Sequence, residues 1–154
     1  MDDRFLYCSC WLHGELRAYD LSDPAAPKLA QILHIGGLLV DDGVSKIRRT
    51  DGIELRPPTT VRGRVIVGGP QMLQLTPDGR RLYVTTSLYR RWDEQFYPDL
   101  VTTGGVLLKV DVSSTGEMTL DESFLVDFGT LPGGPFLAHE TRIPTGDCTS
   151  DIWP

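Results

Sequence analysis

The stretches Phe5–Tyr7 (FLY) and Gly14–Ser22 (GELRAYDLS) reappear later in the chain as Arg81–Tyr83 (RLY) and Gly105–Ser113 (GVLLKVDVS). Both longer copies keep one pattern: glycine, any residue, leucine, any two residues, an apolar residue, aspartate, an apolar residue and serine. Repetition of one unit at a fixed spacing is typical of repeat architectures. We therefore expect the chain to contain the same structural unit twice.

The segments between turns have the composition of β-strands. The chain carries 16 glycines and 11 prolines, and the apolar runs between them are short and rich in β-branched and aromatic residues. No window shows a convincing helical period. The expected strands form two meanders: Arg4–Trp11, Gly14–Leu21 and Lys28–Ile35, then Gln71–Leu75, Arg81–Ser87, Gly105–Val112 and Glu117–Phe128.

Repeated four-stranded meanders are typical of β-propellers, in which a blade takes roughly 40 to 50 residues. The 154 residues therefore predict an all-β, incomplete β-propeller of about two four-stranded blades plus a partial third. Residues 1–154 are treated as one segment, with loop insertions at 36–69 and 88–104. Because propellers have at least about four blades, we expect this chain to be incomplete alone. It would need a missing N-terminal propeller segment or a homo-oligomer.

Two charged regions stand out against an acidic background. The formal net charge of −6 argues against binding to nucleic acid, which requires clustered positive charge. Residues 46–64 nevertheless hold six basic side chains, which either attract an anionic partner or keep a loop solvated. Residues 88–104 are dense in aromatic and charged side chains, so this insertion is either a lid or contact loop or a plain connection.

Neither a membrane nor a secretory route is indicated. No apolar run approaches the roughly 18 residues of a transmembrane segment, and the first residues lack the pattern of a signal peptide. Three cysteines do not make a disulfide framework. These features predict a cytoplasmic protein in a reducing compartment.

Several long strings resemble the C-terminal third of the selenium-binding protein/methanethiol oxidase family. They cover nearly the whole chain and are specific in composition. The strings are Ser9–Arg17 (SCWLHGELR), Gly68–Met72 (GGPQM), Leu82–Tyr89 (LYVTTSLY), Trp92–Leu100 (WDEQFYPDL), Phe124–Gly129 (FLVDFG) and Ala138–Trp153 (AHETRIPTGDCTSDIW).

This resemblance implies a copper-dependent methanethiol oxidase, which converts a small thiol, methanethiol, with oxygen and water to formaldehyde, hydrogen sulfide and hydrogen peroxide. His13 and His139 lie in matching strings, and imidazole is a natural ligand of copper, so both are candidate metal ligands. The alternative is that each is a hydrogen-bonded core or rim residue. Glu140, beside His139, is the candidate catalytic group, as a base or as a support for a ligand.

Cysteines supply the candidate contacts to a thiol or to selenium, namely Cys10 and Cys148. Cys8 and Cys10 are two apart on a predicted strand, so they face the same side. They could present two sulfurs to a soft metal or be packed thiols. For Cys148, a structural role in closing the propeller ring is the alternative.

Two other functions stay open beside the oxidase. The chain could be a non-catalytic module that binds selenium, thiols or proteins, or it could be a degenerate fragment that folds poorly. Copper bound after purification would distinguish the enzyme from the binding module.

Overall fold

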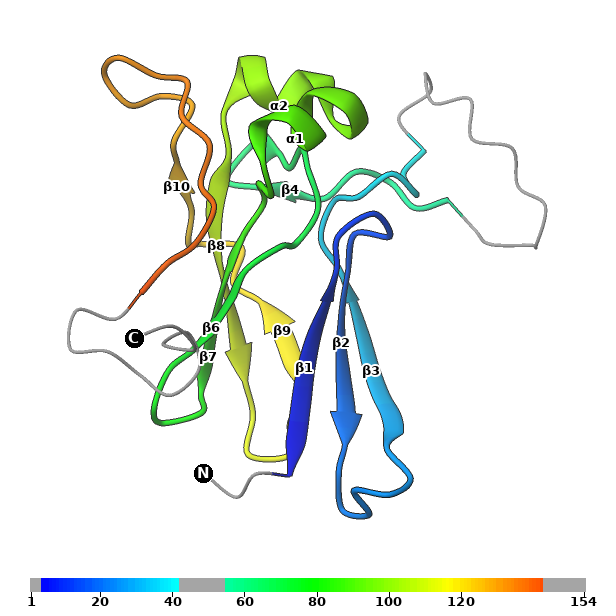
Figure 1. The fold of residues 1–154 in the computed structure, drawn as a ribbon. Coiled ribbons are helices and arrows are strands. Elements are labelled where there is room, and N and C mark those ends of the chain that lie inside the picture. The colour runs from blue at the N-terminus through cyan, green and yellow to red at the C-terminus, as the bar shows by residue number, and fades with distance from the viewer. Residues whose placement is uncertain (1–3, 42–54, 143–154) are drawn as a thin grey trace.

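The computed structural model describes residues 4–41 and 55–142 (Figure 1). Two antiparallel β-sheets pack against one another, and two short helices lie together at one end of them. Strand residues clearly outnumber helical residues in the described ranges, which agrees with an all-β class. Within these ranges the strands do not close into a ring, so the propeller and its number of blades stay predictions.

The first sheet has the order β1-β2-β3, with β1 at Phe5–Cys10, β2 at Glu15–Asp20 and β3 at Lys28–His34. An aspartate turn separates the last two strands. One carboxylate oxygen of Asp20 accepts hydrogen bonds from the backbone N–H of Ser22 at 2.8 Å and from its hydroxyl at 2.6 Å. This local bonding competes with the strand ladder and turns the chain.

The second sheet has β6 at Leu73–Leu75, β7 at Arg81–Thr85 and β8 at Val106–Val112. Two further strands, β9 at Met118–Leu120 and β10 at Val126–Asp127, both pair with β8. The single strand expected over Glu117–Phe128 is therefore interrupted. Its interruption has a local cause, because the Asp121 carboxylate accepts hydrogen bonds from the backbone and hydroxyl of Ser123 at 2.8 and 2.6 Å.

The repeated sequence unit is a repeated hairpin. In the first sheet Phe5 pairs with Asp20, and in the second sheet Arg81 pairs with Asp111. These are equivalent positions of the two sequence copies, so both copies form the same antiparallel hairpin in the same register. The prediction that one unit occurs twice is confirmed at this level.

The core lies between the two sheets. Leu16 and Ala18 of β2 are fully buried together with Val84, Leu108 and Val110 of the second sheet. Burying apolar surface contributes roughly 25 cal/mol per Å², so this contact is the main force that holds the sheets together.

The side chain of Gln31 makes two hydrogen bonds between the sheets. The amide of Gln31 donates to the Met118 carbonyl at 2.8 Å and its oxygen accepts from the Met118 N–H at 2.6 Å.

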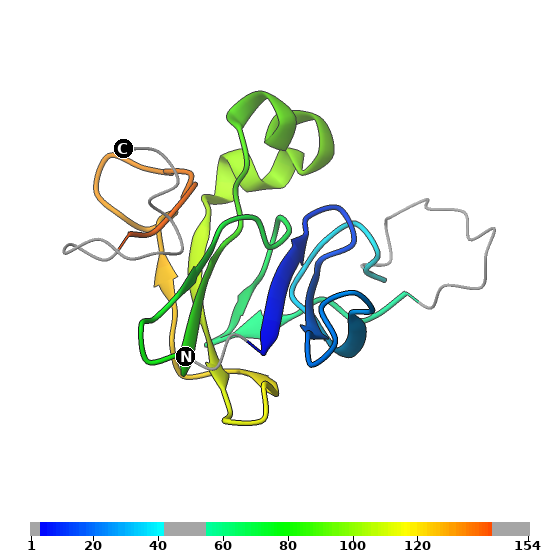
Figure 2. The ribbon, with the colours of Figure 1, turned by 60° about the horizontal axis from the view of Figure 1, so that its bottom comes forward.

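Both insertions contain regular structure. The described part of 36–69 includes a short hairpin, β4 at Thr60–Val61 and β5 at Arg64–Val65. Residues 88–104 contain α1 at Arg90–Phe96 and α2 at Pro98–Thr103, which lie together at one end of the sheets (Figure 2). This differs from the expectation of strands and loops alone, because helices of six or seven residues are too short to show a sequence period. Neither helix is long or apolar enough to cross a membrane, and no other helix occurs in the described ranges.

Candidate functional site

The turn between β1 and β2 carries His13 at the same end of the molecule as the helices. Gly14 has φ +73°, and a Cβ on it would overlap the carbonyl oxygen of Gly36. Only glycine allows this contact, through which the turn packs against the segment that follows β3. The Leu38 N–H donates to the Leu12 carbonyl at 2.9 Å and also holds the turn against this segment. His13 itself is exposed.

An aromatic cluster attaches this turn to the helices. The ring of Trp11 lies 6.2 Å from Trp92, 5.5 Å from Phe96 and 5.2 Å from Tyr97, measured between centroids. The Tyr97 hydroxyl donates to the Trp11 carbonyl at 2.8 Å. Burial, followed by the negative charge of Asp93, raises the pKa of Tyr97, so this hydroxyl keeps its proton and stays a donor.

A fully buried carboxylate fixes the start of α1. Asp93 accepts hydrogen bonds from the Ser87 hydroxyl at 2.6 Å and from the Leu88 N–H at 3.1 Å. Its backbone carbonyl accepts from the Tyr97 N–H at 2.7 Å. Buried carboxylates require such partners, so Asp93 holds the chain between β7 and α1 in one conformation.

His139 lies at the start of α1. Its ring stacks on Tyr89, the residue before α1, with centroids 5.4 Å apart and planes tilted by 24°. Its backbone carbonyl accepts a hydrogen bond from the Thr85 hydroxyl at 2.5 Å. Glu140 is exposed, and its carboxylate lies 2.9 Å from Nε of Arg142.

The two candidate metal ligands are attached to α1 through different neighbours. His139 contacts the residue before the helix, whereas His13 belongs to the turn whose Trp11 contacts Trp92 and Phe96 within the helix. In the described part of the chain, no group of three or more histidine, cysteine, aspartate or glutamate side chains is arranged to hold a metal. These residues alone do not form a complete copper site.

Two cysteines lie on β1, the strand that leads into the turn with His13. Cys8 and Cys10 are both on β1, are partly accessible and carry free thiols. They pair across the sheet with Arg17 and Glu15. Cys148, the other candidate contact to a thiol or to selenium, lies outside the described residues.

Two cavities border these elements. One, of about 390 Å³, is lined by Gly37, Ile66, Phe96 and Tyr97 among others, and so lies beneath the helices. A Cβ on Gly37 would meet the backbone of His13, which places that turn at the edge of the cavity.

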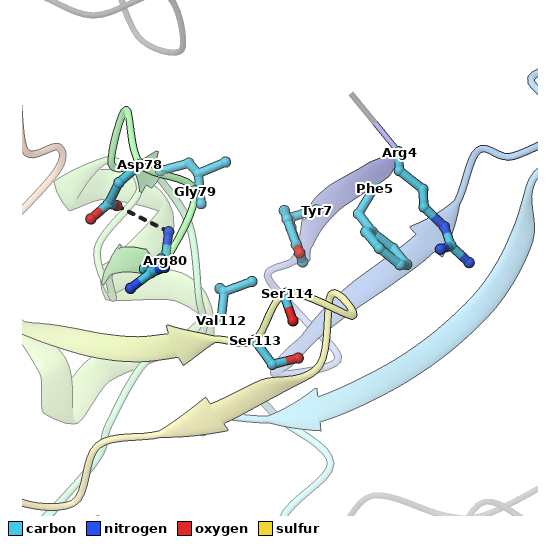
Figure 3. Close-up of a pocket in the computed structure, with 10 residues that line it drawn as sticks. Arg4, Phe5, Tyr7, Asp78, Gly79, Arg80, Val112, Ser113 and Ser114 are labelled. Carbon is cyan, nitrogen blue, oxygen red and sulfur yellow. Dashed lines mark hydrogen bonds between the residues drawn. The ribbon is translucent and has the colours of Figure 1, made fainter. Parts of the chain in front are cut away.

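The second cavity lies along the free side of β1 (Figure 3). It has a volume of about 360 Å³ and separates Phe5 and Tyr7 from the two turns that carry Asp78 and Ser113. Asp78 is held in its turn by a hydrogen bond from the Arg80 N–H at 3.0 Å. Among the described strands, only β2 pairs with β1, so this cavity, here termed the edge groove, runs beside an open sheet edge.

Sequence reasoning did not single out the residues that organise the site. Tyr89, Asp93 and Tyr97 all fall in residues 88–104, which stood out by their aromatic and charged side chains and by the strings Leu82–Tyr89 and Trp92–Leu100, but none of the three was given a role. The buried state of Asp93 and the direction of the Tyr97 hydroxyl depend on tertiary contacts, which no local pattern records.

The repeated antiparallel hairpin places this chain among all-β proteins built from a repeated unit. A sequence model described as 56 kDa selenium binding protein (SBP56) matches residues 1–154. The chain therefore belongs to this selenium-binding protein family.

Named relatives agree with this membership. The chain is 54% identical to a human methanethiol oxidase over 99% of its own length and 53% identical to selenium-binding protein 2 of Mus musculus over the same share. It spans about a third of the length of these relatives, 33% in each case. The crystal structure of a hypothetical selenium-binding protein from Sulfolobus tokodaii matches 97% of this chain and 28% of its own, with a TM-score of 0.73 and 37% identity.

Proposed function

We propose that this chain supplies one portion of a methanethiol oxidase of the β-propeller type. The supporting observation is the 54% identity to a named methanethiol oxidase across nearly every residue of the chain. The reaction is an oxidation in which methanethiol, oxygen and water give formaldehyde, hydrogen sulfide and hydrogen peroxide. Because the chain spans a third of such relatives, turnover would require the remaining propeller segment or a homo-oligomer.

Copper would supply the redox chemistry, and this chain would contribute only some of its ligands. His13 is exposed and stands on a turn seated by glycine contacts, so its position is set by the backbone. His139 is oriented by its stack on Tyr89. Since the described residues do not complete a metal site, further donors would have to come from outside them.

The other residues have supporting roles in this proposal. Glu140 would orient His139 or accept a proton from the thiol, which requires its ion pair with Arg142 to open. The small thiol would occupy the cavity of about 390 Å³ beneath the helices, whose lining includes the apolar side chains of Ile66 and Phe96.

The remaining propeller segment has a docking place in this arrangement. The edge groove lies beside the open edge of β1, and a strand added there would extend the first sheet to four strands. The second sheet already has a strand at the equivalent position, because β6 pairs with β7, the counterpart of β1 in the repeated hairpin. The apolar side chains of Phe5 and Leu75 would contact the added strand.

A binding role without turnover is the second candidate. The family name and the accessible thiol of Cys10 favour a site that takes up a thiol or selenium without oxidising it. Cys148 would be the second contact in that role. This candidate predicts a metal-free protein that releases no peroxide.

The test uses the purified chain with a segment that supplies the remaining propeller strands. Copper content and methanethiol-dependent peroxide release are measured on the same sample, together with the His13→Ala and His139→Ala variants. The proposal expects bound copper and turnover that both variants lose. A folded complex that releases peroxide equally well with both variants would refute the assigned ligands, and a folded, copper-free and inactive complex would favour the binding role.

A further inference from the structure

The outer face of the first sheet presents two thiols side by side. Along β1 the side chains alternate, and those of Tyr7 and Ser9 point to the second sheet, where they donate to the carbonyls of Gly116 at 3.4 Å and Gln71 at 2.7 Å. Cys8 and Cys10 consequently lie on the opposite face of the strand. Both are partly accessible, so an ion in solvent can reach them.

The spacing of the two thiols excludes a disulfide but suits a bridging ion. Two residues along a strand span about 6.8 Å, and their Cβ atoms are about as far apart. A disulfide needs Cβ atoms about 3.5 to 4.5 Å apart, which Cys8 and Cys10 cannot reach while β1 stays paired with β2. An ion between two sulfurs, with metal–sulfur bonds of about 2.3 Å, needs them only about 4.6 Å apart. Each sulfur must then move by about 1 Å along the strand toward the other, because the two side chains share the difference between the Cβ spacing and the required sulfur spacing.

The number of donors selects the kind of ion. Among the described residues, no third histidine, cysteine, aspartate or glutamate joins this pair to make a metal cluster. Zinc in structural sites takes four ligands in a tetrahedron, so two sulfurs leave it half coordinated. Thiolates favour soft monovalent copper, which accepts two ligands in a line.

Charged side chains flank the two thiols on this face. A monovalent cation bound by two thiolates carries one net negative charge. Arg17 pairs directly with Cys8 across the strands, while Glu15 pairs with Cys10 and holds Arg17 in place, its carboxylate oxygen lying 2.7 and 2.8 Å from the Arg17 nitrogens. His34 lies beyond Glu15, with Nδ1 3.9 Å from the carboxylate. Burial, followed by Cys10, raises the pKa of Cys8, while Arg17 acts in the opposite direction, so the thiol is protonated until the ion displaces its proton.

We propose that Cys8 and Cys10 form a two-coordinate site for a soft monovalent cation, with monovalent copper as its biological representative. Binding forms two metal–sulfur bonds, releases two protons to solvent and changes no oxidation state. This site goes beyond the proposed oxidase, because it uses neither His13 nor His139.

The test is an anaerobic titration of the reduced chain with monovalent copper against a competing chelator, combined with X-ray absorption spectroscopy. We expect one ion bound to the Cys8 and Cys10 pair, with two sulfur neighbours and no nitrogen neighbours. Cys8→Ser, an almost isosteric change, should weaken copper binding by more than about 100-fold. Loss of a group that only orients a metal ligand weakens binding by about 10- to 100-fold, so a larger loss identifies Cys8 as a ligand. Leu6→Ala, at an exposed position of the same strand, should bind monovalent copper as the wild type does.

Two results would overturn the proposal. One is unchanged affinity and sulfur coordination in a Cys8→Ser variant whose circular dichroism matches that of the wild type. The other is a zinc affinity equal to that for monovalent copper at the same cysteines. Failure of the oxidase proposal is separable, because peroxide release should depend on His13 and His139 and should be the same in the Cys8→Ser variant as in the wild type.

Discussion

Replacing Asp93 by alanine removes the acceptor of two hydrogen bonds at a position where no solvent reaches. The Ser87 hydroxyl at 2.6 Å and the Leu88 N–H at 3.1 Å would both lose their partner. Hydrogen bonds to a charged group contribute about 1.5 to 3 kcal/mol each. Two such bonds predict that the free energy of unfolding falls by about 3 kcal/mol or more.

The matched control is Asp93→Asn, which keeps the shape. Its oxygen can still accept from the Leu88 N–H and its amide can donate to the Ser87 oxygen, so the variant loses the charge and the acceptor of the Ser87 hydroxyl but keeps both contacts. We expect about 1 to 2 kcal/mol for this variant. Urea denaturation followed by tryptophan fluorescence measures both values, because Trp92 lies on α1.

A double-mutant cycle makes the reasoning refutable. Ser87→Ala and Asp93→Ala should be coupled by about 1 kcal/mol or more, since the two side chains contact each other. An Asp93→Ala variant within about 0.5 kcal/mol of the wild type, the range of ordinary surface substitutions, would show that this carboxylate does not hold α1. Equal losses for alanine and asparagine would show that hydrogen-bond geometry is not the cause.

Three further outcomes follow from other contacts. Tyr97→Phe leaves the Trp11 carbonyl without its donor at 2.8 Å and should cost about 1 to 2 kcal/mol in urea denaturation. The pKa of Asp121 in the folded state is lowered from its ordinary value of 3.8, first by the hydrogen bond from Lys109. The carboxylate therefore stabilises the fold above pH 3.8, and this stabilisation is lost as the pH falls below that value. Asp121→Asn should make the free energy of unfolding depend less on pH in this acid range. Gly14→Ala would drive a Cβ into the Gly36 oxygen at φ +73°, and should lower the thermal midpoint more than any surface substitution.

Each of these outcomes has a result that contradicts it. A Tyr97→Phe variant as stable as the wild type would mean that water replaces the hydroxyl. An unchanged acid titration for Asp121→Asn would remove this carboxylate from the pH dependence. A Gly14→Ala variant with the wild-type midpoint would show that the turn can move away from the segment after β3.

The sequence predicted the strands better than the segments between them. The repeat identified both hairpins and their equivalence, because alternation and turn residues are local properties of the chain. It did not predict α1 and α2, whose conformation depends on the buried Asp93 and on the contacts of Trp11. It also missed the interruption at Asp121, although an aspartate two residues before a serine is the same turn signal as at Asp20.

The candidate site was predicted only as a set of residue types. His13 and His139 stood in specific strings, but their attachment to α1 through Trp11 and Tyr89 is a property of packing. Their roles as metal ligands, that of Glu140 as a catalytic group and that of Cys10 as a contact stay predictions. Cys148 lies outside the described ranges, as do three of the six basic residues of 46–64, namely Lys46, Arg48 and Arg49.

The hydrogen bonds of Gln31 have a consequence for motion between the sheets. Its carboxamide donates and accepts in the manner of a peptide group, so Met118 is bound as if by a neighbouring strand although β3 and β9 belong to different sheets. Sliding one sheet along the other by a single residue would break both bonds at once and bring no equivalent pair into place. These two hydrogen bonds therefore fix one register between the sheets. Apolar side chains alone would allow several registers.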